Sequence, residues 1–97
     1  MTDKELIARA ADFAGLTRLK HDRFGGGGWY TAVYGSAKVH FWVSTHSCAD
    51  SESASCSGAC LMVWVDSNPN PIMEIMVEMN LHGQIIKHQI GVHHKAF

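Results

Sequence analysis

At the start of this chain, hydrophobic residues recur with the period of an α-helix. Between residues 3 and 14 the apolar positions recur three and four residues apart, as on one face of a helix: Leu6, Ile7, Ala10, Ala11, Phe13 and Ala14. Thr2 stands three residues before Glu5, a capping-box pattern, and Gly15 follows as a helix terminator. The pattern predicts one amphipathic helix over residues 3 to 14, too short to be stable unless it packs on the rest of the chain.

From Trp29 onward the period changes to two, which is typical of strands that bury one face. Val39, Phe41 and Val43 alternate with polar residues and Trp42, for example. Turn-forming residues separate the segments that follow this pattern. The predicted strands are Trp29–Tyr34, Lys38–Thr45, Leu61–Val65, Ile72–Met79 and Gln84–His94. We therefore predict an α+β fold in which the N-terminal helix packs on an antiparallel meander of about five strands.

Length, composition and charge narrow the class of protein. A chain of 97 residues has room for one hydrophobic core, so residues 1–97 are predicted to form a single domain. A formal net charge of −1 and the lack of a basic patch argue against a nucleic-acid partner. The apolar runs are too short to span a bilayer, and the first residues lack the features of a secretory signal. We expect a cytoplasmic protein without a membrane partner.

The side chains best suited to chemistry gather in one segment, Ser44–Cys60, which we expect to be a single loop. His46, Cys48, Cys56 and Cys60 supply the four soft ligands of a tetrahedral zinc site, and zinc would order this serine-rich loop. Three other interpretations remain open. They are a Cys56–Cys60 disulfide, which an intracellular setting disfavours, free cysteines without a chemical role, and a catalytic thiol at Cys48 assisted by His46.

An enzyme is not the expected class, because the sequence shows no nucleophile elbow and a domain of this size has little room for a substrate cleft. A binding surface is favoured instead. One short helix cannot cover both faces of the sheet, so some of Trp42, Trp64, Ile72 and Met76 are expected on an open face, where aromatic and methionine side chains often mark protein interfaces.

Charge is distributed unevenly along the chain in a way that suggests the kind of partner. Between Val39 and Ile86 there are five acidic residues and no lysine or arginine. An acidic surface favours a protein partner with a basic surface, and a homodimer is an alternative. The predicted partner-binding residues are Trp42, Trp64, Asp50, Glu52, Asp66, Glu74 and Glu78.

The opening segment Thr2–Leu16, TDKELIARAADFAGL, resembles the start of small accessory proteins of tailed bacteriophages, in which a short helix ending in Ala-Gly precedes a small β-sheet. The resemblance implies a phage protein that binds and inhibits a host component in the host cytoplasm, as anti-CRISPR proteins do. It carries over no site residue. The leading prediction is therefore a non-enzymatic binding protein, with a zinc-stabilised module as the alternative and a thiol enzyme as a third class.

Overall fold

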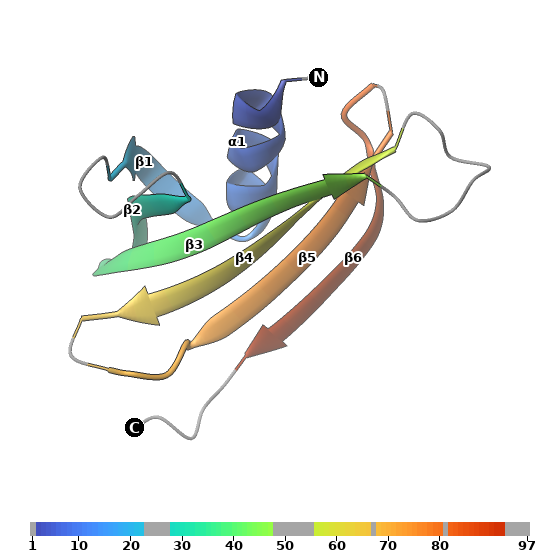
Figure 1. Cartoon of the computed structure of the whole chain (residues 1–97). Helices are drawn as coiled ribbons and strands as arrows, with labels where there is room; N and C mark the ends of the chain where they lie inside the picture. Colours follow the sequence, from blue (N-terminus) through green and yellow to red (C-terminus); the bar gives the residue numbers. More distant parts are fainter. Residues whose placement is uncertain (1, 23–27, 48–55, 67, 81, 93–97) are drawn as a thin grey trace.

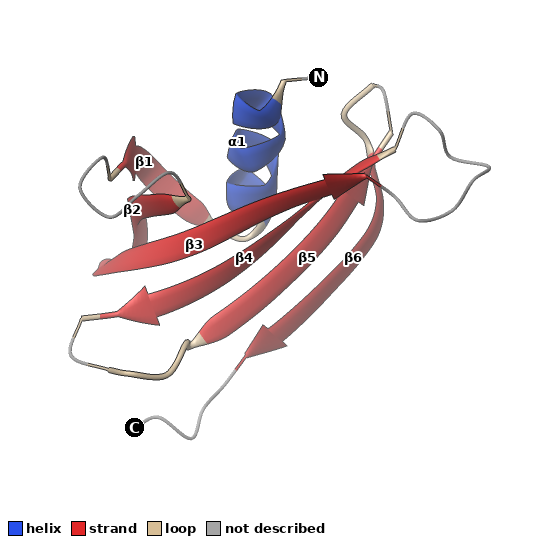
Figure 2. Cartoon of the chain, in the orientation of Figure 1, coloured by secondary structure: helices blue, strands red, loops and turns tan. Residues whose placement is uncertain are grey.

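The structure is a computed structural model that describes residues 2–22, 28–47, 56–66, 68–80 and 82–92. One helix is followed by six antiparallel strands, each paired with the next along the chain, so that the sheet is a meander (Figures 1 and 2). The elements are α1 (Asp3–Phe13), β1 (Leu16–His21), β2 (Trp29–Tyr34), β3 (Ala37–Ser47), β4 (Ser57–Val65), β5 (Met73–Met79) and β6 (Ile85–Val92). The predicted α+β class is confirmed.

The N-terminal helix forms as its sequence predicts. The Thr2 hydroxyl accepts a hydrogen bond from the backbone N–H of Glu5 at 3.2 Å, which satisfies one of the free donors of the first turn. At the other end Gly15 has φ of +83°, a conformation that glycine adopts without steric cost. The buried face of α1 comprises Leu6, Ile7, Ala10 and Ala11.

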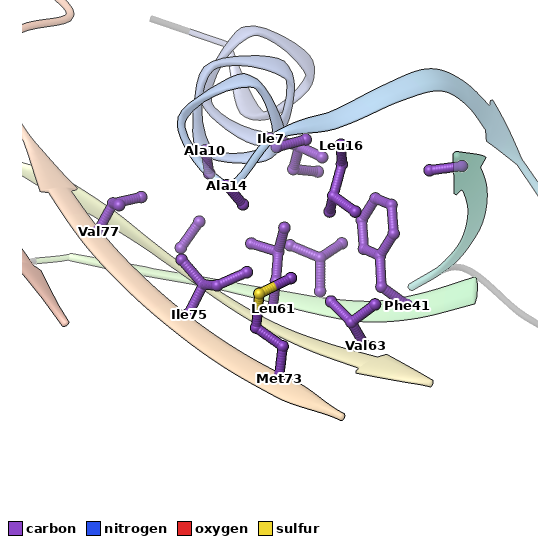
Figure 3. Close-up of a cluster of buried hydrophobic side chains, with 14 of the residues drawn as sticks. Ile7, Ala10, Ala14, Leu16, Phe41, Leu61, Val63, Met73, Ile75 and Val77 are labelled. Carbon is purple, nitrogen blue, oxygen red and sulfur yellow. The ribbon is translucent and has the colours of Figure 1, made fainter. Parts of the chain in front are cut away.

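The core lies between α1 and the face of the sheet that it covers (Figure 3). The alternating residues of the three central strands point into it, as the period of two predicts: Val39, Phe41, Val43, Ala59, Leu61, Val63, Met73, Ile75, Val77 and Met79. The β1–β2 end of the sheet curls toward α1, and there Leu16 and Ala32 complete the core (Figure 1). This arrangement leaves the other face of the sheet without a described helix over it.

The sheet differs from the sequence prediction at its first strand. Residues 16 to 21 form β1, which was not predicted because Thr17, Arg18 and Lys20 interrupt any alternation. A bulge between Thr17 and Lys20 also interrupts the pairing of β1 with β2, and Arg18 lies in this bulge with φ of +54°. The sheet therefore has six strands, one more than the number expected.

The predicted loop Ser44–Cys60 is shorter than expected. The pairing of β3 with β4 continues through Thr45 and Ala59 to Ser47 and Ser57. His46 and Cys60 are therefore strand residues and do not belong to a loop. The position of Ile72 also differs from the prediction. Ile72 was among the residues considered for an open face, whereas it packs against the core, and its N–H donates to the carbonyl of Val63 at 2.7 Å.

Candidate functional site

The face of the sheet opposite α1, called the open face here, collects most of the residues singled out in the sequence. Cross-strand register defines its rows, because directly paired residues in an antiparallel sheet point to the same side. One row joins Trp29, Trp42, Met62, Glu74 and Gly91, one strand after the next. The neighbouring rows are Thr31, His40 and Trp64 on one side, and Ser44, Cys60, Met76 and Gln89 on the other.

Four aromatic side chains of β2, β3 and β4 form a connected cluster on the open face. The Trp29 ring centroid lies 5.4 Å from that of Trp42 and 5.3 Å from that of Trp64. His40 is 5.7 Å from Trp29 and stacks on Trp64 at 6.0 Å with an angle of 9° between the rings. These are favourable separations for aromatic pairs, so the rings fix one another in position. Trp42 remains 39% exposed within this cluster.

Two members of the cluster, Trp29 and His40, were not among the predicted partner-binding residues. Each strand considered separately shows an aromatic residue without showing its neighbour. The signal that identifies them is the register of β2 on β3, which sets Trp29 opposite Trp42. A two-residue turn at Gly35-Ser36 is compatible with that register.

Acidic residues lie on the same face as the aromatic cluster. Glu74 and Glu78 are on the open face of β5, opposite Met62 and Gly58. Asp66, just after β4, has its Oδ1 atom 3.6 Å from Nδ1 of His40. Five of the predicted partner-binding residues thus lie on one face: Trp42, Trp64, Asp66, Glu74 and Glu78. The other two, Asp50 and Glu52, lie outside the described residues.

Cations occupy the β1–β3 end of the same sheet. A hollow of about 520 Å³ there is lined by Arg18, Lys20, Lys38 and His40, together with Asp22 and Asp66. The open face is therefore acidic along β5 and mixed in charge at the β1 end. A second hollow, of about 330 Å³, lies over β4, β5 and β6 and includes Cys60, Met62, Glu74, Met76, Gln89 and Gly91 in its lining.

The predicted zinc ligands are only partly brought together. His46 and Cys60 are in adjacent rows of the open face, but Cys48 lies outside the described residues. Cys56 is buried and disulfide-bonded, and an oxidised cysteine has no thiolate to offer a metal. Within the described ranges no group of three or more His, Cys, Asp or Glu side chains is arranged to hold an ion. Zinc binding by this set remains a prediction, and it applies to the reduced protein.

Cys60 is a free thiol, so the Cys56–Cys60 disulfide considered from the sequence is wrong. Cys60 lies within β4, four residues after Cys56, and it pairs with Met76 across the sheet. Burial raises the pKa of the Cys60 thiol, and the negative charge of Glu78 raises the pKa further. Cys60 is therefore held in its protonated form, which is a poor nucleophile.

No protein-family model, curated protein sequence or solved structure matches this chain. The helix in the described part of the chain is too short to cross a membrane. The candidate site is accordingly defined by its own geometry: an aromatic cluster with acidic residues beside it on the open face.

Proposed function

We propose that this chain is a non-enzymatic protein-binding module that uses its open face to dock a protein with a basic surface. The observation that carries the proposal is the aromatic cluster of Trp29, His40, Trp42 and Trp64, which remains partly exposed. Large aromatic side chains dominate the energetics of protein interfaces, particularly when they are already held in place. Rigid rings lose little conformational entropy on binding, which favours a cluster of this kind as an anchor.

The charges beside the cluster support a basic partner. Glu74 and Glu78 lie on the open face of β5, four residues apart with Met76 between them, and Asp66 lies at the end of β4. Acidic groups around an apolar centre steer a basic partner and fix its orientation. We expect association to slow as ionic strength rises, because salt screens exposed charges at separations beyond about 8–10 Å.

The resemblance of Thr2–Leu16 to phage accessory proteins adds a biological role to this proposal. A small protein that binds by one face inhibits its target by covering the target's working surface. We propose on this basis that the partner is a host protein, such as a component of a bacterial defence system, and that inhibition occurs by occlusion.

Two aromatic residues of equal exposure on opposite faces make the test specific. Trp42 on the open face is 39% exposed, and Tyr34, at the end of β2 beside Gly15, is 41% exposed. Proteins retained by the wild-type chain from host extract are identified by mass spectrometry, purified and titrated calorimetrically with the wild type, Trp42→Ser and Tyr34→Ser. We expect Trp42→Ser to weaken binding at least about tenfold, as for an interface anchor, and Tyr34→Ser to leave it unchanged.

Charge reversal supplies an independent arm. Glu74→Lys is expected to weaken binding and to flatten its dependence on salt, whereas Asp12→Lys on α1 is expected to do neither. Thermal unfolding of each variant shows that the fold is retained. The proposal fails if the purified partner binds Trp42→Ser and Glu74→Lys as tightly as the wild type, or if Tyr34→Ser alone abolishes binding.

A further inference from the structure

The last strand of the sheet has an unusual edge. Among the described strands β6 pairs with β5 on one side and with no strand on the other. From Ile86 to Val92 every residue of β6 is exposed. In an antiparallel strand the N–H and C=O groups of alternate residues point outward along such an edge, where they can pair with another strand.

The side chains of β6 are more apolar than a protected edge requires. Ile86, Ile90 and Val92 are 52%, 44% and 53% exposed. Ile90 and Val92 are paired with Ile75 and Met73 of the core face, so they point to the α1 side of the sheet. On that side α1 reaches β6 at His88, whose ring centroid is 5.0 Å from that of Phe13. The other edge, β1, is shorter, carries Arg18 and Lys20 and is bent by a bulge, all of which discourage pairing. Of the two edges, β6 is the one suited to bind a strand.

An unfilled space on the open face, next to this edge, indicates which kind of side chain a strand paired with β6 would place there. Gly91 ends the row that contains Glu74, and a Cβ atom built on Gly91 would have no atom within 4 Å. The hollow of about 330 Å³ reaches this position and is lined by Glu74, Met62 and Met76. A side chain with a long apolar stem and a positive end fits such a hollow, because the stem packs on methionine and the charge faces the carboxylate.

Lys87 of a second copy has these properties. We propose that this chain forms a homodimer in which β6 pairs antiparallel with β6 of a second copy, centred on Gln89, so that the partner's Lys87 enters the hollow beside Gly91 and faces Glu74.

The register follows from symmetry. A two-fold axis through the middle of the β6 pair keeps both α1 helices on one side of the joined sheet, and paired residues then belong to the same face. With Gln89 on the axis, Gly91 lies opposite the partner's Lys87, and Ile90 lies opposite the partner's His88. Two strand spacings, about 10 Å, then separate the Cα atoms of Glu74 and the partner's Lys87, a span that the two side chains bridge across the glycine.

The same register places each Lys87 between two carboxylates. Within its own chain Lys87 is already opposite Glu78. Pairing adds the partner's Glu74 on its other side, and symmetry makes the arrangement occur twice. The resulting twelve-stranded sheet would bring the two open faces side by side. This inference concerns the β6 edge and does not rest on the proposed function.

Charge exchange tests the contact directly. Sedimentation equilibrium over a series of concentrations measures the dimer constant of the wild type, Glu74→Lys, Lys87→Glu and the double variant. We expect each single variant to weaken dimerisation at least about tenfold, since like charges then face each other twice in the interface. The double variant restores the opposite charges and is expected to regain most of the affinity. Asp12→Lys, on α1, is the matched control and is expected to dimerise as the wild type does.

A cross-link tests the register. In a Cys60→Ser background, Gln89→Cys places two thiols next to each other on the axis, within the Cα separation that a disulfide requires. We expect mild oxidation to give a covalent dimer from this variant and not from Thr31→Cys, which is exposed on β2. A wild-type chain that stays monomeric at its highest soluble concentration overturns the proposal and leaves the edge to a strand of another protein. A dimer that is indifferent to Glu74→Lys, or that Gln89→Cys fails to trap, overturns it equally.

Discussion

The His46 imidazole lies over the backbone of Gly58, so that a Cβ atom on Gly58 would collide with the ring. The two residues are paired across β3 and β4, and Glu78 is the next residue in the row. The Nε2 atom of His46 is 4.0 Å from Oε1 of Glu78. Glycine thus opens a path over which a histidine reaches a carboxylate two strands away.

Gly58→Ala is expected to close this path. The ring of His46 must turn away, which separates it from Glu78 and lowers the free energy of unfolding by about 1 kcal/mol. Gly91→Ala, measured at a concentration at which the chain is monomeric, is the matched control, because its new methyl group meets open space within one chain and is expected to change stability by less than about 0.5 kcal/mol. Urea unfolding measures both values, and the NMR signals of the His46 ring report its movement. An unchanged ring signal in Gly58→Ala would contradict the described geometry.

Adjacent residues of β4 lie on opposite faces of the sheet, so we expect their substitutions to have different effects on stability. Leu61 is 1% exposed in the core, and Met62 points to the open face. Leu61→Ala is expected to cost about 2–5 kcal/mol because it leaves a cavity between α1 and the sheet. Met62→Ala is expected to cost about 1 kcal/mol or less. Denaturant unfolding of the pair checks the assignment of faces, and equal losses would show that both side chains are buried.

Periodicity in the sequence was sufficient for the core strands. Val39, Phe41 and Val43 alternate without interruption, so their burial follows from the pleat of a single strand. The pattern fails where the backbone departs from that pleat. Arg18 takes a left-handed conformation in a bulge, and β1 therefore has no regular alternation to detect. Ile72 precedes β5, and its alternation with Met73 does not determine which way it points.

The candidate site depended on information that a single strand does not contain. Trp42 and Trp64 were expected on an open face from their own segments. Their contact with Trp29 depends on how β2, β3 and β4 are aligned, and this is a property of strand pairs. The β6 edge was also hidden, because a run of apolar and polar residues is similar in central and edge strands.

The protonation of Cys60 predicts a dependence of reactivity on pH. Because burial and Glu78 raise the pKa of this thiol, less thiolate is present at mildly alkaline pH than in an unfolded chain. Alkylation of Cys60 by iodoacetamide, followed by mass spectrometry, is expected to be slower in the folded protein than in urea. Glu78→Gln removes the nearby charge and is expected to speed the reaction, whereas Asp12→Asn on α1 is expected to leave it unchanged.

The same shift affects stability with a definite sign. The folded state holds the Cys60 proton more tightly than the unfolded chain does, so this contribution to stability is complete below the pKa of the unfolded thiol. This contribution begins to decline above about pH 8.5, the ordinary pKa of a cysteine thiol. It is lost as the pH rises through the pKa of Cys60 in the folded state. Unfolding of the wild type and Cys60→Ser over this range isolates the effect. A stability difference that grows in favour of the wild type with rising pH would show the opposite sign.

The zinc hypothesis makes a prediction that depends on the redox state. Of the four ligands His46, Cys48, Cys56 and Cys60, the three cysteines must be thiolates, and Cys56 is disulfide-bonded in the structure. Native mass spectrometry of the reduced chain is therefore expected to show the added mass of one zinc ion, and the oxidised chain is expected to show none. Cys60→Ser removes one ligand without affecting Cys56 and is expected to weaken zinc binding, whereas Met62→Ala on the same strand is a control that keeps all four. A reduced chain that gains no mass, or a Cys60→Ser variant that binds zinc as the wild type does, excludes this ligand set and leaves His46 and Cys60 as members of the open face.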